Sequence, residues 1–435
     1  MQQDADVKTR SSLKTGLFSI IISLIAWTII VLPQGNAVEC AVGPFPENFM
    51  WGVSSSGFQS EGNNPASQWT EWAATGHTRD QPGVSADLLH RYREDIKLAK
   101  AMNVNTFRIG IEWSRIEPIQ GSYDSSAIAF YDDLIDSIVT EGMTPVVTLH
   151  HFSHPQWFEE SGGFVNPANA GFFVTHALFI VNRYKEKVKY WITFNEPNIY
   201  VLCGFILGTW PPGMRNILIA ARVNQVMMET HRALYDYIHQ ADPQAKVSFT
   251  FFEFQFGWPL CGVIGNCFFE QNRLLKAAAD KCDYIALDYY YRYSTLREAL
   301  SPLWAAPIHP EGLYRVLKKY SAAYPWLPIF IMENGMATYN GAPRADGWTR
   351  EKHLAHMLYN VQRAYSEGVN VIGYSYWSLT DNYEWGSFDP RFGLYTVDCL
   401  SDPSLTRLAT GAVEVYKEII DKGSVPTAFL DGNTD

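Results

Sequence analysis

Several signals that commonly reveal a protein's chemistry are missing from this sequence. It has no C-x-x-C motif, and no cysteine is paired with a histidine at the spacing of a zinc site. No strand-like run is followed by a G-x-G-x-x-G turn, the fingerprint of a dinucleotide-binding sheet. Basic residues number 34 against 45 acidic ones, the net charge is −11, and no long basic run occurs. We therefore expect no metal site and no nucleic-acid partner.

The six cysteines give little guidance. Cys261 and Cys267 lie close together in "CGVIGNC", where they could close a small disulfide ring. The other four are scattered along the chain, so the overall connectivity stays open.

Residues 1–37 stand apart from the rest. A basic start with Lys8, Arg10 and Lys14 precedes the uncharged run 17–32, and helix breakers and small residues follow. This pattern is typical of a secretory signal peptide. The run is somewhat short for a membrane span of about 20 residues but long for a signal, so an uncleaved membrane anchor is the alternative. Either reading predicts a secreted, periplasmic or otherwise extracytoplasmic protein.

Residues 38–435 are expected to form a single domain, because a short apolar run followed by a helix-like stretch recurs along them. The strand-like runs are 49–56, 106–114, 145–151, 190–196, 246–254, 283–290, 329–334 and 371–379. Buried parallel strands are nearly continuous in apolar residues, as these are. The repeat predicts an α/β fold, a (β/α)8 TIM barrel, with an open doubly wound sheet as the alternative.

Three of the helix-like stretches are 87–102, 126–142 and 352–368. The last two end in Gly142 and Gly368, where a helix C-cap is expected.

Polar and aromatic residues gather where the apolar runs end. They are Gln59, Arg108, His150, His151, Asn195, Glu196, Asp288, Tyr290, Glu333, Asn334 and Trp377. In "WITFNEPN" the apolar residues lead directly to Glu196, and Pro197 is expected to end the strand. Because the C-terminal ends of barrel strands meet at one mouth, these residues predict a single site.

Two of these residues, Glu196 and Glu333, belong to the fourth and seventh runs, which lie across a barrel from each other. Two carboxyl groups that flank a glycosidic bond are the usual means of hydrolysing it. One must be protonated and the other ionised, and Arg108 could keep the ionised one charged. Asn195 suits a hydrogen bond to a sugar hydroxyl.

From about Phe45 to beyond Asp398, the sequence resembles glycoside hydrolase family 1, the β-glucosidase family. The resemblance is carried by "FPENFMWGVSSSGFQSEG", "FRIGIEWSRIEP", "TLHHFSHPQW", "TFNEP", "MENG" and "YWSLTDNYEWGSFDPRFGLYTVD". It implies that Glu196 is the general acid/base and Glu333 the nucleophile of a retaining double displacement, with carboxyls roughly 5–5.5 Å apart.

The resemblance also implies roles for the neighbouring residues. Arg108 and Tyr290 would orient the nucleophile, and Trp377 would form the floor beneath the sugar. The residues that would bind sugar hydroxyls are Gln59, His151, Asn195, Glu384 and Trp385. No cofactor or metal is implied, and the partner is a small-molecule β-glycoside.

Some residues depart from the family pattern. Asp288 stands where the family has Asn, Phe152 where it favours Trp, and Ser153 where it favours Asp. Asp288 brings a charge where an amide is expected. The segment around 255–275 lacks the usual long loop, so the leaving-group side of the site is expected to differ.

Two residues restrict which branches of the family the sequence resembles. Trp385 after Glu384 argues against the phospho-sugar branch, and Glu rather than Gln at position 196 argues against the thioglucosidase branch. A neutral β-D-glycoside is favoured, with β-glucoside first. A transglycosidase that uses the same intermediate and a non-catalytic sugar-binding barrel are the alternatives, and the oligomeric state is left open.

Overall fold

The computed structural model describes residues 42–256 and 272–430. The predicted signal peptide or anchor and the Cys261/Cys267 pair lie outside these residues. Within the described ranges, none of the helices combines the length and apolar character that a membrane span requires.

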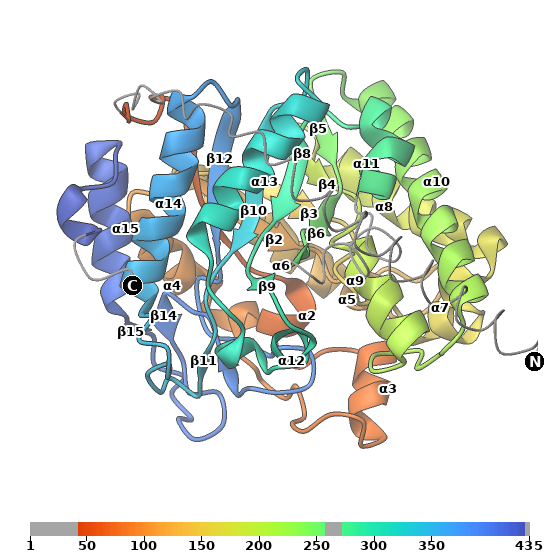
Figure 1. Cartoon of the computed structure of the whole chain (residues 1–435). Helices are drawn as coiled ribbons and strands as arrows, with labels where there is room; N and C mark the ends of the chain where they lie inside the picture. The colour runs from red at the N-terminus through yellow and green to blue at the C-terminus, as the bar shows by residue number, and fades with distance from the viewer. Residues whose placement is uncertain (1–41, 257–271, 431–435) are drawn as a thin grey trace, which may run out of the picture. The chain divides into compact units, whose positions relative to one another are not determined.

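Parallel strands form the centre of the unit that begins at Val42 (Figure 1). Along the sheet the order is β5, β4, β3, β2, β1, β12, β10, β8 and β6. Their bounds are β1 (Met50–Ser54), β2 (Thr106–Gly110), β3 (Thr144–Thr148), β4 (Tyr190–Ile192), β5 (Lys246–Ser248), β6 (Thr250–Phe252), β8 (Ile285–Asp288), β10 (Ile329–Asn334) and β12 (Val371–Trp377).

The sheet closes on itself through its fifth strand. β5 and β6 are successive pieces of one run, divided only at Phe249. β5 pairs with β4, and β6 pairs with β8, so the two ends of the strand order are continuous in the chain. The predicted (β/α)8 barrel is confirmed, and the open doubly wound alternative is wrong.

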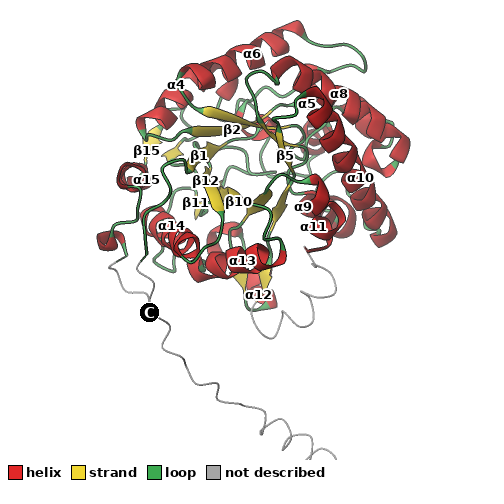
Figure 2. Cartoon of the chain, turned by 90° about the horizontal axis from the view of Figure 1, so that it is seen from above, coloured by secondary structure: helices red, strands yellow, loops and turns green. Residues whose placement is uncertain are grey.

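Helices surround the strands (Figure 2). The longer ones are α4 (Leu88–Ala101), α6 (Ser125–Thr140), α8 (Ala170–Tyr184), α10 (Ile217–Ala241), α13 (Pro310–Ala323), α14 (Arg350–Ser366) and α15 (Gly411–Lys422). The shorter helices are α2 (Gly57–Ser60), α3 (Gln68–Ala74), α5 (Trp113–Ile116), α7 (Gln156–Glu160), α9 (Pro197–Val201), α11 (Asn272–Ala278), α12 (Leu296–Ala299) and a π-helix (Leu202–Leu207). The short strands are β7 (Gln255–Phe256), β9 (Arg292–Tyr293), β11 (Thr338–Tyr339), β13 (Pro390–Arg391), β14 (Tyr395–Thr396) and β15 (Leu408–Ala409).

The strands are apolar on both faces because each face packs in a separate hydrophobic core. Val146 and Ile192 belong to a cluster formed by residues of the strand segments, whereas Val147 and Trp191 pack in the large cluster that includes helix residues such as Leu134. Successive side chains of a strand point to opposite faces, so a strand buried on both sides has no polar alternation.

Two predicted helix ends are confirmed. α6 and α14 are each followed by a glycine in the left-handed region, Gly142 with φ 74° and Gly368 with φ 89°. Glycine adopts this conformation without a steric penalty, which is why it follows these helices.

The fourth strand ends earlier than predicted. Pairing in β4 stops at Ile192, and Pro197 is the first residue of α9 rather than the residue that ends the strand. Proline suits the first position of a helix because no intrahelical bond needs its missing N–H. Glu196 is the residue before it, with a left-handed φ of 39°.

A buried ion pair fixes the C-terminal part of the chain to α4. The guanidinium of Arg407 donates to both carboxylate oxygens of Asp95, at 2.8 and 3.0 Å, and both side chains are 1% exposed. We predict that Asp95→Ala lowers the free energy of unfolding by about 3–5 kcal/mol, because it leaves a buried cation without a charged partner. Urea unfolding followed by circular dichroism measures this change.

The control is Glu418→Ala, which removes a partner of Lys422 from a pair that is 43% and 54% exposed. It should cost only about 0.3–0.5 kcal/mol. Equal losses for the two variants would show that the buried pair has no special role.

Candidate active site

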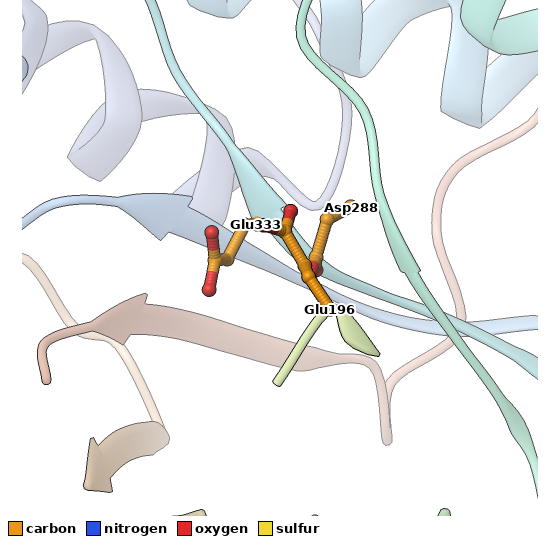
Figure 3. A group of neighbouring side chains, drawn as sticks. All are labelled: Glu196, Asp288 and Glu333. Carbon is orange, nitrogen blue, oxygen red and sulfur yellow. The ribbon is translucent and has the colours of Figure 1, made fainter. Parts of the chain in front are cut away.

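Three carboxyl groups meet at the mouth of the barrel, meaning the C-terminal ends of its strands (Figure 3). Glu196 lies between β4 and α9, Asp288 is the last residue of β8, and Glu333 lies near the end of β10. One oxygen of each lies within 4.8 Å of one oxygen of each of the others, and all three side chains are buried. Glu196, Asp288 and Glu333 are far apart in the chain, but the fold brings their carboxyl groups together at one point.

Glu333 is held by two donors. Arg108 Nη1 donates to its Oε1 at 2.5 Å, and the Tyr290 hydroxyl donates to its Oε2 at 2.8 Å. Burial disfavours the charge of Arg108, but the negative charges of Glu333 and Asp288 outweigh this and raise its pKa. Burial and the charge of Glu333 raise the pKa of Tyr290 well above its usual value, so the phenol stays a donor. Both donors stabilise negative charge on Glu333.

Glu196 is in a different environment. Burial raises the pKa of its carboxyl well above the usual value, and the charges of Glu333 and Asp288 raise it further. Its backbone N–H donates to Thr250 Oγ1 at 3.0 Å, and the Thr250 hydroxyl donates to Asn195 Oδ1 at 2.9 Å. The protonated form of Glu196 is therefore favoured, beside a carboxylate that two donors hold.

Glu384 is held by one residue of α2 and by the last residue of β12. It accepts hydrogen bonds from Gln59 Nε2 at 3.2 Å and from Trp377 Nε1 at 3.1 Å. Burial raises its pKa to about 8. The Gln59 and Trp377 donors fix the carboxyl at the mouth, where it can accept bonds from adjacent hydroxyls.

Aromatic rings form one wall of the site. The His151 ring lies 5.7 Å from Trp377 and 5.9 Å from Trp385, nearly parallel to both. Burial, with Arg108 nearby, lowers the pKa of His151 well below its usual value, so the ring is neutral. Asn195 Nδ2 is buried and has no hydrogen-bond partner among the described residues. These faces and free polar atoms suit a ligand with apolar C–H faces and hydroxyl edges.

All ten predicted site residues thus lie at the mouth, and three further residues support them. Thr250 links Glu196 to Asn195, Asn382 accepts from Gln59 Nε2 at 3.2 Å, and Trp210 packs 5.5 Å from Trp385. Asn382 stands directly before "YEW", so its place beside Glu384 was a usable signal. Thr250 and Trp210 carried none, because their roles depend on contacts between distant segments.

Two departures from the family pattern are accommodated by packing. Phe152 has a left-handed φ of 63° and packs 5.0 Å from Trp210 and 5.1 Å from Trp385. The Ser153 hydroxyl donates to the buried Glu112 at 3.0 Å. Most of the shortened segment around 255–275 lies outside the described residues.

Comparison with known proteins identifies the family of this chain. The model of glycosyl hydrolase family 1 matches residues 41–260 and 293–424. Beta-glucosidase A of Thermotoga maritima is 27% identical, over 82% of this chain and 94% of its own. A solved beta-glycosidase from Pyrococcus horikoshii has a TM-score of 0.77 at 29% identity and covers 89% of this chain and 97% of its own. The Thermotoga maritima beta-glucosidase in complex with noeuromycin has a TM-score of 0.79 at 26% identity, and the match covers 88% of this chain and 100% of that one.

The interval between the two matched stretches contains Asp288 and Tyr290. Their places in the site therefore come from the structure and not from the match. Since the matched stretches make up well over half of the chain, the protein belongs to glycosyl hydrolase family 1 and is a glycosidase.

Proposed function

We propose that the protein is a retaining β-glycosidase that hydrolyses terminal, non-phosphorylated β-D-glycosides, with β-D-glucosides as the first choice. The observation that carries this proposal is the pair Glu196 and Glu333, two buried carboxyls with oxygens within 4.8 Å. Retaining glycosidases have carboxyl separations of roughly 5–5.5 Å, and inverting ones have roughly 6.5–9.5 Å to admit a water. Two carboxyl oxygens this close leave little room for a water between them, which supports direct attack by a carboxylate.

In the first step Glu333 attacks the anomeric carbon. A bond forms between its carboxylate oxygen and C1, the bond from C1 to the glycosidic oxygen breaks, and the proton of Glu196 moves to that oxygen. Arg108 and Tyr290 hold the attacking carboxylate in position until its charge is used. The products are a glycosyl ester of Glu333 and a free alcohol.

In the second step Glu196, now ionised, takes a proton from a water molecule whose oxygen attacks C1. The ester bond breaks, Glu333 regains its negative charge, and the sugar leaves with its original anomeric configuration. Two inversions at C1 account for retention.

The sugar is expected to lie on Trp377, with Glu384, Gln59 and His151 around its hydroxyls. Gln59 Nε2 donates to both Asn382 and Glu384, so it holds Glu384 as the acceptor for neighbouring hydroxyls. This polar rim over an aromatic floor suits a pyranose.

The residues near Glu384 are poorly suited to bind a phosphate group on the sugar. Trp385 follows Glu384, and the centre of its ring lies 4.9 Å from that of Trp69 and 5.9 Å from that of Phe58. The nearby cation Arg391 lies 3.7 Å from the carboxylate of Asp398. These contacts favour an unphosphorylated substrate.

Glu333→Ala should lower kcat for a nitrophenyl β-glucoside by at least about 10³-fold, because no carboxylate remains to form the intermediate. Added azide should restore turnover and give the α-glycosyl azide, which NMR identifies. Glu253→Gln is the control, since Glu253 is also buried but is bonded to Tyr320 at 2.6 Å. Undiminished hydrolysis by the alanine variant would refute the nucleophile assignment.

Glu196→Ala should reduce the rate according to the leaving group. Cleavage of a phenyl β-glucoside should fall by about 10²–10⁴-fold, whereas formation of the intermediate from a dinitrophenyl β-glucoside should change little, since that leaving group needs no proton. Azide should give the β-glycosyl azide. Stopped-flow and steady-state rates for the two substrates measure this, and equal losses for both would contradict the acid role.

A further inference from the structure

Asp288 is the third carboxyl group of the site, and the two-carboxylate mechanism does not use it. It has no exposed surface, and in the sheet it pairs with Phe252 of β6 on one side and Glu333 of β10 on the other. Figure 3 shows its side chain beside those of Glu196 and Glu333. An acidic residue therefore lies in direct reach of the reacting pair.

The surroundings of Asp288 supply too little positive charge for three carboxylates. The groups that face it are two carboxyls, one guanidinium and two neutral hydroxyls, from Glu196, Glu333, Arg108, Thr250 and Tyr290. With all three carboxyls ionised, the buried cluster would carry a net charge of about −2, which is very unfavourable away from water. At least one proton must be retained.

The hydrogen bonds show where that proton belongs. Both oxygens of Asp288 and Oε1 of Glu196 are buried, and none of them accepts a bond from another described residue. Glu333, in contrast, accepts from both Arg108 and Tyr290. A proton between Asp288 and Glu196 would provide the missing O–H donor for this pair and leave Glu333 ionised.

We propose that Asp288 and Glu196 share one proton, and that Asp288 is a positioning residue which keeps the acid/base glutamate protonated to a higher pH than an amide at position 288 would. This inference rests on the proposed function of Glu196. The direction of the shifts supports it: burial, with the charge of Glu333, raises the pKa of Asp288 well above its usual value, while Arg108 opposes the effect.

The charges of the cluster balance through the reaction. Before the first step Glu333 carries one negative charge and the Asp288/Glu196 pair carries another. When the proton moves to the leaving oxygen, the pair gains a second charge, and Glu333 becomes a neutral ester in the same step. The net charge beside Arg108 is unchanged, and the water's proton restores the pair in the second step.

The test is the pH dependence of kcat/KM for a phenyl β-glucoside, measured with the full chain and with Asp288→Asn. In the variant, the alkaline limb of the profile should shift toward lower pH by about one to two pH units. For a dinitrophenyl β-glucoside, which needs no proton, the shift should be smaller. A limb that stays in place in an active variant would overturn the proposal and leave the glycosidase assignment intact.

Two further variants separate proton sharing from a general structural effect. In a Glu196→Ala background, Asp288→Asn should no longer move the profile, because its partner is gone. Glu253→Gln should leave the wild-type limb unchanged. A shift of equal size in the Glu196→Ala background would contradict the proposal.

Infrared difference spectroscopy tests the proton directly and does not depend on turnover. Wild type at neutral pH should show a protonated carboxyl band that is lost or shifted in Asp288→Asn, and in Asp288→Ser if the amide variant does not fold. If EDTA moves the band or the alkaline limb, a cation occupies the cluster and the proposal is wrong. If no aryl β-glycoside is cleaved but the band behaves as expected, the proposed function fails while the shared proton stands.

Discussion

The buried guanidinium of Arg108 is the interaction on which the site depends. It donates to Glu333 of β10, to Asn195 after β4 and to Thr148 of β3, so one cation joins segments from opposite sides of the barrel. A cation with no exposed surface is tolerated only when its donors are satisfied, and removing a partner from such a pair is strongly destabilising. The same contacts hold the carboxylate of Glu333, the proposed nucleophile, in place before a substrate arrives, as electrostatic preorganisation requires.

Much of the barrel could be predicted because its strands are buried on both faces. Runs such as β2 and β10 are almost continuously apolar, and a carboxylate or an arginine among them is conspicuous. That is how Glu196, Glu333 and Arg108 were found. The left-handed backbone of Glu196 and the bonds of Thr250 could not be predicted, because they depend on a hydroxyl more than fifty residues away in the chain. The break at Phe249 likewise leaves no pattern, because polar and apolar residues alternate without interruption from Lys246 to Phe251.

Asp288 illustrates the limit of reading residues one at a time. The sequence identified it as a departure from the family pattern and predicted a local change in charge. Only the structure shows that it is fully buried, that it pairs with Glu333 in the sheet and that its oxygens lack donors among the described residues. We propose that it acts by sharing a proton with Glu196, so that the two side chains together keep one negative charge.

The split fifth strand links closure of the barrel to its chemistry. β5 and β6 contribute three residues each, and the hydroxyl that receives the backbone N–H of Glu196 belongs to the first residue of β6. The residues that close the barrel are therefore also those that hold the backbone of Glu196, the proposed proton donor. Loss of the pairing between β6 and β8 would both open the barrel and release that support.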